Sequence, residues 1–578
     1  MIIFVQCILG RCLSGPVLRR TWLGLGGVVC VLAAGLAAFG LNSGFGVPFT
    51  SLVQILPFIL IGIGVDDMFV IVAAFDQTDP ALPIEERVAL GLKRCGVSVT
   101  YTSLTNFAAF MLGSTTSLPA VEYFCLYAGT AILLNFFLQI SAFVALLTMD
   151  VNRQNAGKFD WCCCFSSKKF LEQSAKQRDI TTIATSTGTA ATASSTTTTT
   201  SDVRIGRIGM FMKEKYTPFL LSAKGKTRVL LGTTGLLAAG IYGVTQATQG
   251  FDVINLAPDD HFAREYIEAS RDYMLEFNSH FVPLNIYTRD VDYTKVIVQA
   301  SIQATDELML EQPYVEGPLQ SWLVSFVAWA SNKTEYSANI GKSGGYPVYK
   351  DPDTFYIALV DFLNDESNAR FESDIVYDDA GLIKISRSEF FLSDITDTNK
   401  QVDSLLDARN VVDQSNLEPE QFAFSEVFIL IEQFLVIYNE LILNFSMALL
   451  AVVVMSLIVL GKISITALVC FTVVVIDVEL LGFIYHYGLE INSTTVIQLI
   501  MAVGLVVDYM VHIVHYFLHQ DPSIPKDARI ASALGEIGPS IMVGAATTFL
   551  GIIPLAFASN FIFRVFFKMF ILIIGFGV

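Results

Sequence analysis

The sequence predicts a polytopic α-helical membrane protein that is built from two parallel repeats and carries an acidic domain outside the membrane. Three observations lead to this fold class: an apolar composition, apolar blocks long enough to cross a bilayer, and an internal repeat that places acidic residues inside both halves. Apolar residues make up 53% of the 578 residues and charged residues only 16%, whereas roughly a quarter of the residues in soluble domains are charged. The composition therefore excludes an ordinary soluble protein.

Ten apolar blocks are expected to span the membrane as helices, since about 20 residues cross the hydrocarbon core. In chain order they are residues 23–41, 52–75, 97–112, 123–149, 229–247, 441–460, 463–486, 494–518, 537–558 and 561–578. Residues 1–13 are expected to belong to a further span. The chain is thus predicted to be an integral, multi-pass protein of the plasma membrane or an endomembrane.

Basic residues fall in alternate loops, and loops of this kind face the cytosol. The loops 42–51 and 113–119 hold no basic residue, and the opposite set contains Arg19, Arg20, Arg87, Lys93, Arg94, Lys168, Lys169, Lys213, Lys215, Lys224, Lys226, Lys462, Lys526 and Arg529. The segment 249–440 is therefore predicted to be exoplasmic or lumenal. Acidic residues within 251–430 exceed basic ones by more than the whole net charge of −18. No basic patch suits nucleic acid, so no nucleic-acid partner is expected.

Five parts are expected along the chain. They are a first-half transmembrane bundle (1–149), a cytosolic linker (150–227), a single transmembrane helix (228–248), an acidic exoplasmic domain (249–440) and a second-half bundle (441–578). The threonine-rich tract 181–201 of the linker cannot bury a core and is expected to be a disordered tether.

Short motifs suggest two kinds of modification site. Cys162, Cys163 and Cys164 follow a span and precede basic residues, which suits palmitoylation. An unmodified apolar turn is an equal alternative, and the thiols lack the further ligands of a zinc site. Asn332 begins an Asn-Lys-Thr sequon in the exoplasmic domain and is a candidate for N-glycosylation, while the sequon at Asn444 lies at a span and is expected to be unused. No motif implies a cofactor or a metal.

A gapless internal repeat relates the two bundles. The segments 62–66 and 504–508 match at an offset of 442, and 17 of the 46 positions in 62–107 are identical to their counterparts at that offset. The loop prolines Pro83 and Pro525 lie in register, which argues against a chance match of two apolar stretches. Equivalent spans carry the same orientation, so the repeats are parallel. The offset also leads us to expect that the chain is a fragment, with a first exoplasmic domain and its flanking span missing upstream.

Three carboxylates lie inside predicted spans: Asp66 and Asp67 in the first half, and Asp508 in the second. Ionisable groups in the membrane are costly and mark functional sites. Gly62 and Gly504 precede the repeat-related aspartates by four residues and are expected to let the two repeat helices cross closely, with Gly64 as a further packing glycine. Carboxylates brought together in this way disfavour double ionisation, so one of them would bind and release a proton. A purely structural role in hydrogen bonding is the alternative.

The partners of these carboxylates can also be predicted in part. Adjacent Asp66 and Asp67 point about 100° apart on a helix, so only one can face Asp508. The repeat indicates that Asp66 is the residue that faces Asp508. Asp67 is expected to pair with Thr102, Thr105 or Asn106. His512 shares a helix face with Asp508 and is a candidate proton relay, with simple packing as an equal alternative. His515 is expected to sit at the membrane interface. Asp477 and Glu479 are weaker candidates.

The segment 62–69, Gly-Ile-Gly-Val-Asp-Asp-Met-Phe, resembles the GxxxDD motif in the fourth span of Patched-type proteins of the resistance–nodulation–division (RND) superfamily. The segment 504–508 resembles the matching site in the tenth span. The segment 424–438 resembles the one that leads into the eighth span, and 282–287 resembles a strand of the second exoplasmic domain. The resemblance implies a duplicated RND-like bundle, a sterol-sensing domain in the spans up to residue 149, and an α+β porter-like exoplasmic domain.

The resemblance also implies a function. Family members move sterols or other lipids under a cation gradient, so we expect membrane lipid or sterol and a proton or sodium ion as partners, with Asp66, Asp67 and Asp508 coupling the ion. A sterol-binding sensor or receptor without net transport is the alternative. We recognise no nucleophile–base pair and no cluster of metal ligands, so an enzyme is not expected.

Overall fold

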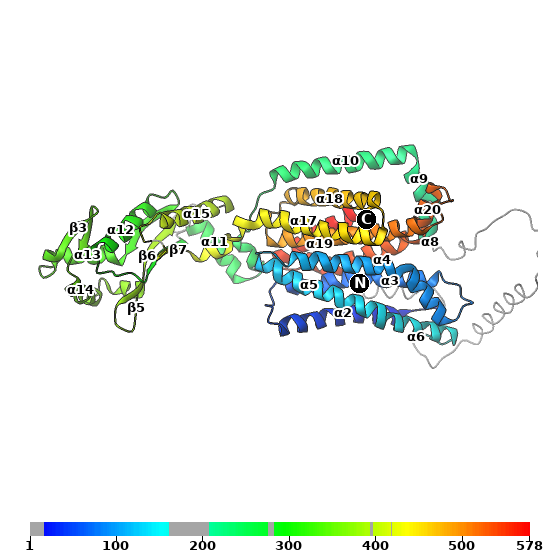
Figure 1. Cartoon of the computed structure of the whole chain (residues 1–578), viewed down its shortest axis with the longest axis horizontal. Coiled ribbons are helices and arrows are strands. Elements are labelled where there is room, and N and C mark those ends of the chain that lie inside the picture. Colours follow the sequence, from blue (N-terminus) through cyan, green and yellow to red (C-terminus); the bar gives the residue numbers. More distant parts are fainter. Residues whose placement is uncertain (1–16, 161–206, 275–281, 394–396, 418) are drawn as a thin grey trace, which may run out of the picture. The chain divides into compact units, whose positions relative to one another are not determined.

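The computed structural model describes residues 17–160, 207–274, 282–393, 397–417 and 419–578. The chain divides into two compact units (Figure 1). Unit 1 consists of Met1–Thr248 together with Ile437–Val578, and unit 2 is Gln249–Val436. The residues 162–164, 181–201 and 1–13, for which the sequence predicts palmitoylation, a tether and part of a span, lie outside the described residues.

The first half of unit 1 is a bundle of long helices. They are α2 (Thr21–Gly44), α3 (Leu56–Asp76) with the short 3-10 turn η1 (Val53–Ile55) before it, α4 (Ile84–Gly113), and α5 (Pro119–Leu138), which continues through the π-helical turn η2 (Gln139–Phe143) into α6 (Val144–Asn155). The short segments α8 (Arg207–Phe211), η4 (Met212–Tyr216) and α9 (Thr217–Leu221) then lead into α10 (Ala223–Gln246), which lies along α18 at the edge of the bundle (Figure 1).

The second half of unit 1 repeats this pattern. Its helices are α17 (Gln433–Leu460), α18 (Ile463–His486), α19 (Ser493–His519), α20 (Lys526–Glu536), α21 (Gly538–Ala556) and α22 (Phe561–Gly577). Among the described residues, eight helical stretches are long and apolar enough to cross a membrane, and each coincides with a predicted span. The other two predicted spans, 97–112 and 561–578, fall on α4 and α22. The predicted multi-pass membrane protein is confirmed.

Three pairs of helices begin at repeat-related residues. α2 and α18 begin at positions 21 and 463, α4 and α20 at 84 and 526, and α5 and α22 at 119 and 561, so each pair is 442 residues apart. Gly46 and Gly488, also 442 apart, both end a turn with positive φ, of 83° and 64°, a conformation that glycine adopts without steric cost. The duplication therefore extends from the sequence motifs to the helix boundaries and the turns.

One helix of the repeat is continuous in the first half and divided in the second. α4 runs unbroken from Ile84 to Gly113, whereas its counterpart is split at Ile537 into α20 and α21. The split coincides with Pro539, which stands where the first half has Val97. Proline has no N–H to donate and its ring clashes with the carbonyl four residues earlier, so it favours the start of a new helix.

Near the C-terminus of each carboxylate-bearing helix, α3 and α19, an arginine from the following helix stacks on a phenylalanine ring. The Arg87 guanidinium lies 4.3 Å from the centre of the Phe75 ring, and Arg529 lies 4.2 Å from the Phe517 ring. Arg529 also donates to the Phe517 carbonyl oxygen at 2.6 Å. A cation at a helix C-terminus is favourable because the last carbonyls carry partial negative charge. Both pairs are repeat-related, so both carboxylate helices are anchored at their C-terminal ends in a similar way.

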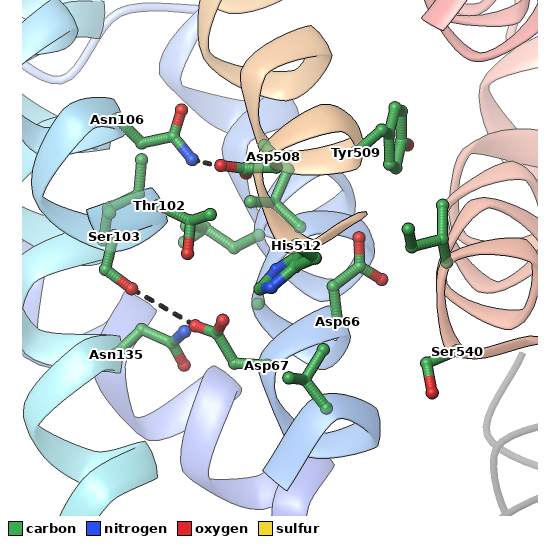
Figure 2. A pocket seen from close by; sticks show the side chains of 16 residues that line it. Asp66, Asp67, Thr102, Ser103, Asn106, Asn135, Asp508, Tyr509, His512 and Ser540 are labelled. Carbon is green, nitrogen blue, oxygen red and sulfur yellow. Dashed lines mark hydrogen bonds between the residues drawn. The ribbon is translucent and has the colours of Figure 1, made fainter. Parts of the chain in front are cut away.

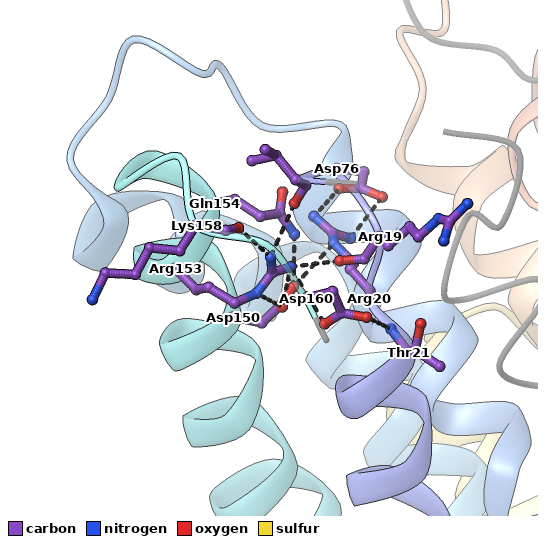
Figure 3. Close-up of polar contacts among 10 residues, drawn as sticks. Arg19, Arg20, Thr21, Asp76, Asp150, Arg153, Gln154, Lys158 and Asp160 are labelled. Atoms are coloured by element: carbon purple, nitrogen blue, oxygen red, sulfur yellow. Dashed lines mark hydrogen bonds and ion pairs between the residues drawn. The ribbon is translucent and has the colours of Figure 1, made fainter. Parts of the chain in front are cut away.

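A buried charge network closes the predicted cytosolic end of the first half (Figure 3). Arg20 forms two parallel hydrogen bonds to Asp76 of α3, at 3.0 and 3.2 Å, and an ion pair with Asp150 of α6 at 3.4 Å. Arg153 donates to Asp150 at 2.8 and 3.0 Å. The Asp160 carboxylate accepts from the backbone N–H of Thr21 at 2.7 Å, at the first residue of α2. The network therefore ties together the ends of α2, α3 and α6.

Unit 2 is an α+β domain, as expected. Its main sheet is antiparallel, with β2 (Val315–Ser321), β6 (Ile383–Leu392), β1 (Val282–Arg289) and β7 (Gln421–Phe424) in that order, and with β5 (Ile375–Tyr377) also paired to β6. A separate hairpin joins β3 (Ile340–Ser343) to β4 (Tyr346–Tyr349). The helices are α11 (Phe262–Met274), α12 (Val296–Leu310), α13 (Trp322–Asn332), α14 (Pro352–Asn364), α15 (Thr398–Asp413) and α16 (Glu426–Ile431).

A buried carboxyl group joins α12 of unit 2 to the sheet. Asp306 is 1% exposed, and its Oδ2 accepts a hydrogen bond from the Ser388 hydroxyl on β6 at 3.0 Å. Its Oδ1 is buried and has no hydrogen-bond partner among the described residues. Burial disfavours the charged form and raises the pKa of Asp306 to about 7.

We expect unit 2 to be more stable at acidic than at alkaline pH. The folded-state pKa of Asp306 lies above the unfolded value of about 3.9, so its stabilising contribution is lost as pH rises through about 7. Between pH 5 and 8 the free energy of unfolding should fall by about 3 kcal/mol from this group. Hydrogen exchange of unit 2 in the intact protein measures this. Asp306→Asn should flatten the profile and the exposed control Asp379→Asn should not; equal profiles in all three proteins would contradict the assignment.

Candidate functional site

The predicted intramembrane carboxylates meet in one pocket inside unit 1. Asp66 and Asp67 from α3 and Asp508 from α19 all line it, with His512 one turn further along α19 (Figure 2). The remaining lining residues come from α3, α4, α5, α19 and α21, and those with polar side chains are Thr102, Ser103, Asn106, Asn135, Tyr509 and Ser540. The cavity volume is ≈ 30 Å³, room for about one or two water molecules or a small cation.

The three carboxylates are held differently. Asp508 accepts a hydrogen bond from the Asn106 amide at 2.7 Å, and Asp67 accepts one from the Ser103 hydroxyl at 3.2 Å (Figure 2). Asp66 has a buried Oδ1 without a hydrogen-bond partner among the described residues. No described lysine or arginine lines the pocket. Two of the acids are therefore oriented by polar side chains of α4, while one oxygen of Asp66 is left unpaired among the described residues.

The expected partner of Asp67 is wrong in its detail. The sequence predicts Thr102, Thr105 or Asn106 as the hydrogen-bond donor, but Ser103 donates to Asp67. The Asn106 amide donates to Asp508 instead. The Thr102 hydroxyl donates to the carbonyl oxygens of its own helix, at 3.0 and 3.1 Å. Helix periodicity alone does not resolve a one-residue difference, because the rotation of α4 about its axis is set by packing.

The glycines of the repeat motif also pack differently from the prediction. The structure does not show the predicted close crossing of α3 with α19 at Gly62 and Gly504. A Cβ on Gly62 would lie 2.9 Å from Cγ2 of Thr548 on α21, and a Cβ on Gly504 would lie 1.9 Å from Oδ1 of Asn106 on α4. Thr548 and Asn106 are themselves 442 residues apart. Each motif glycine therefore packs against the repeat-equivalent helix of the other half, Gly62 against α21 and Gly504 against α4.

Two further glycines shape the carboxylate site. A Cβ on Gly64 would lie 2.9 Å from Val31 of α2 and 3.2 Å from the Asn135 amide of α5, so Gly64 is a packing glycine as expected. Its carbonyl oxygen accepts from Gln139 of the π-helical turn η2 at 3.2 Å. A Cβ on Gly544 of α21 would lie 2.5 Å from Oδ1 of Asp66. Sequence reasoning missed Gly544, although at the 442-residue offset it corresponds to Thr102, one of the predicted partners of Asp67.

The other sequence candidates lie as follows. His512 is 8% exposed and lines the pocket, whereas Asp477 and Glu479 are buried in α18 and do not line it. His515 is also only 8% exposed, packed among the helices, and its position at the membrane interface stays a prediction. Asn332 is exposed at the last residue of α13, and Asn444 is 1% exposed within α17.

We expect a glycan on Asn332 and none on Asn444. The sequon at Asn332 is exposed in unit 2, while Asn444 is buried against Glu440 inside a predicted span and cannot reach a glycosylation enzyme. Glycosidase treatment of the protein made in a eukaryotic cell should shift its mobility, and Asn332→Gln and Thr334→Ala should each abolish that shift. Asn444→Gln serves as the control. Loss of the shift only in the Asn444 variant would contradict the predicted sidedness of 249–440.

Comparison with known proteins finds similarity along nearly the whole chain. A family model described as the sterol-sensing domain of SREBP cleavage-activation matches residues 16–167. The NPC intracellular cholesterol transporter 1 homolog 1b of Drosophila melanogaster is 26% identical over 96% of this chain and 47% of its own. The NPC1-like intracellular cholesterol transporter 1 of Rattus norvegicus is 26% identical over 98% of this chain and 45% of its own.

The NPC intracellular cholesterol transporter 1 of Sus scrofa is 25% identical over 100% of this chain and 47% of its own. The chain spans about half the length of the curated relatives it matches. The similarity covers both bundles and unit 2, and the sterol-sensing match covers α2 to α6. The resemblance to sterol-sensing-domain proteins that the sequence indicates is therefore confirmed by the match to residues 16–167 and by similarity along nearly the whole chain.

Proposed function

We propose that this protein moves sterol or another hydrophobic lipid through the membrane and couples that movement to an ion gradient at the Asp66, Asp67 and Asp508 pocket. The observation that carries the proposal is the convergence of three acids from two repeat-related helices in one cavity of the bundle, with no lysine or arginine among the described residues that line it. Unpaired charges in hydrocarbon are costly, so carboxylates gathered there are suited to bind and release a cation.

The size of the pocket supports separate sites for the ion and for the lipid. At ≈ 30 Å³ it suits a proton, a water or a small cation, because drug-sized ligands need several hundred Å³, roughly ten times as much. The pocket is therefore proposed as the ion site, and the lipid would travel elsewhere in the protein. Similarity to proteins named as cholesterol transporters supports a sterol as the lipid.

Substitution of the carboxylates tests the proposal. In the full-length protein, Asp66→Asn and Asp508→Asn should each abolish gradient-driven sterol movement in proteoliposomes while sterol binding persists. Asparagine keeps the shape of the side chain and removes the titratable group, so loss of movement reports the charge. The matched control is Asp79→Asn, an exposed acid in the loop between α3 and α4. Sterol movement that is unchanged in both pocket variants would rule out the coupling role.

A sterol-binding sensor or receptor is the second candidate. The match of residues 16–167 to a sterol-sensing domain favours it, since such a domain can bind sterol without transport. Under this function the same variants would keep both sterol binding and its signalling consequence, and no ion flux would accompany sterol addition. Measurement of ion flux with and without sterol therefore separates the two candidates.

A further inference from the structure

Three histidines line one face of α19 between the carboxylate pocket and the end of the helix. His512, His515 and His519 follow Asp508 by 4, 7 and 11 residues, which is the spacing of side chains on a single helix face. His512 lines the pocket (Figure 2), His515 is 8% exposed, and His519, the last residue of the helix, is exposed. The series therefore leads from a buried site to the surface.

The outer two imidazoles are in contact, and each has a nitrogen available for a proton. The His515 and His519 ring centres are 4.2 Å apart. Nδ1 of His519 lies 2.9 Å from the His515 carbonyl oxygen, which only accepts, so Nδ1 carries a hydrogen and Nε2 is the atom that gains or loses a proton. Nε2 of His515 is buried and has no hydrogen-bond partner among the described residues.

The charged groups around this face leave the imidazoles without a counter-ion. On the outer side, Glu536 of α20 accepts from Tyr516 and from Ser532, Arg529 is held on Phe517, and Arg94 of α4 acts electrostatically on Tyr516. On the inner side stand Asp66, Asp67 and Asp508. Among the described residues, no carboxylate forms an ion pair or hydrogen bond with any of the three imidazoles, so none is locked in the charged form.

A structural role accounts poorly for His515. A buried polar nitrogen without a partner costs about 1–3 kcal/mol, and phenylalanine or leucine would fill the same volume in this apolar helix without that cost. Helix packing therefore does not require imidazole at this position, whereas proton transfer does.

We propose that His519 and His515 form the cytosolic leg of a proton path that reaches the carboxylate pocket through His512. The inference rests on the proposed function and specifies its ion as the proton. A proton leaving a pocket carboxylic acid binds His512, passes to His515 and then to His519, and is released to cytosolic water. Each imidazole returns to its neutral form as it passes the proton on, so no other reactant is needed; the reverse order carries a proton inward.

Phenylalanine substitution tests this path because it keeps the aromatic packing and removes the proton site. In the full-length protein in proteoliposomes, His515→Phe should lower sterol-coupled proton flux by at least about tenfold, since a positioned proton donor or acceptor typically contributes 10²–10⁴-fold. His519→Phe should lower it less, because water replaces an exposed imidazole. Both variants should also weaken the dependence of flux on cytosolic pH, because each removes a group that binds and releases a proton.

The matched control is His486→Phe. His486 is an exposed histidine near the opposite end of the neighbouring helix α18, outside the pocket. The His486→Phe variant should leave flux and its pH dependence unchanged. Sterol binding should persist in all three histidine variants, as the measure of correct folding. Unchanged flux and pH profile in His515→Phe would overturn the histidine path while Asp508→Asn still abolished flux. Sodium-driven flux that is insensitive to both histidine variants would overturn it as well. Flux that survives Asp508→Asn would instead refute the proposed function.

Discussion

Gly504→Ala should reduce ion-coupled lipid movement by about 100-fold, the effect expected when a functional group moves by about 1 Å. A Cβ at this position would lie 1.9 Å from Oδ1 of Asn106, so the Asn106 side chain must shift. The same side chain donates the 2.7 Å hydrogen bond that orients Asp508. The substitution thus displaces a carboxylate partner without touching any charged residue. Gradient-driven sterol movement in proteoliposomes measures the effect.

Gly96→Ala is the matched control for this prediction. Gly96 lies in α4, and a Cβ there would meet nothing within 4 Å. Alanine is favoured over glycine in a helix by about 1 kcal/mol, so the control should be as stable as the wild type and as active. The double variant Gly504→Ala with Asn106→Ala relieves the clash but removes the donor, so it should regain stability and remain uncoupled. Full coupling in Gly504→Ala would show that Asn106 does not position Asp508.

Arg20→Met should destabilise the first-half bundle by about 2–3 kcal/mol, because it removes hydrogen bonds between charged groups. Arg20 pairs with Asp76 and Asp150, and the side chains of Arg20 and Asp150 are only 4% and 7% exposed. Loss of the guanidinium removes the paired hydrogen bonds to Asp76, while Asp150 keeps its hydrogen bonds from Arg153. The midpoint of thermal unfolding in detergent, together with the yield of folded protein, measures the change.

Two variants make the Arg20 prediction specific. Lys93→Met removes an exposed cation of α4 and should shift the midpoint little. Arg20→Lys keeps the charge but cannot form the paired hydrogen bonds to Asp76, so it should fall between the wild type and Arg20→Met. Equal midpoints for Arg20→Met and Lys93→Met would contradict a structural role for the network.

The local pattern of the sequence was sufficient for the main architecture. Span positions follow from apolar length, and the 442-residue offset located helices whose first residues coincide, such as α2 with α18 and α4 with α20. The same offset singled out Asp66 and Asp508, which do line one pocket. These features depend on composition and on the order of residues along one helix, both of which are visible without tertiary contacts.

Partners across helices were predicted less well. Ser103, rather than its neighbours, reaches Asp67, and the motif glycines receive Asn106 and Thr548 instead of each other. A side-chain contact between helices depends on the rotation and crossing of both, and a shift of one residue turns a helix by about 100°. The Arg20 network is likewise assembled from residues 56 and 130 positions apart in the chain, so no local pattern indicates it.

The sequence by itself therefore determined that this chain is a duplicated membrane bundle with acids at its centre and an acidic α+β domain, because apolar length, repeat register and charge are properties of the chain alone. Only the tertiary structure decided which donor holds which carboxylate, where the π-helical turn places Gln139, and that the histidines of α19 lead from the pocket to the surface. Those outcomes depend on the packing of several helices at once, where a displacement of about 1 Å makes or breaks a hydrogen bond.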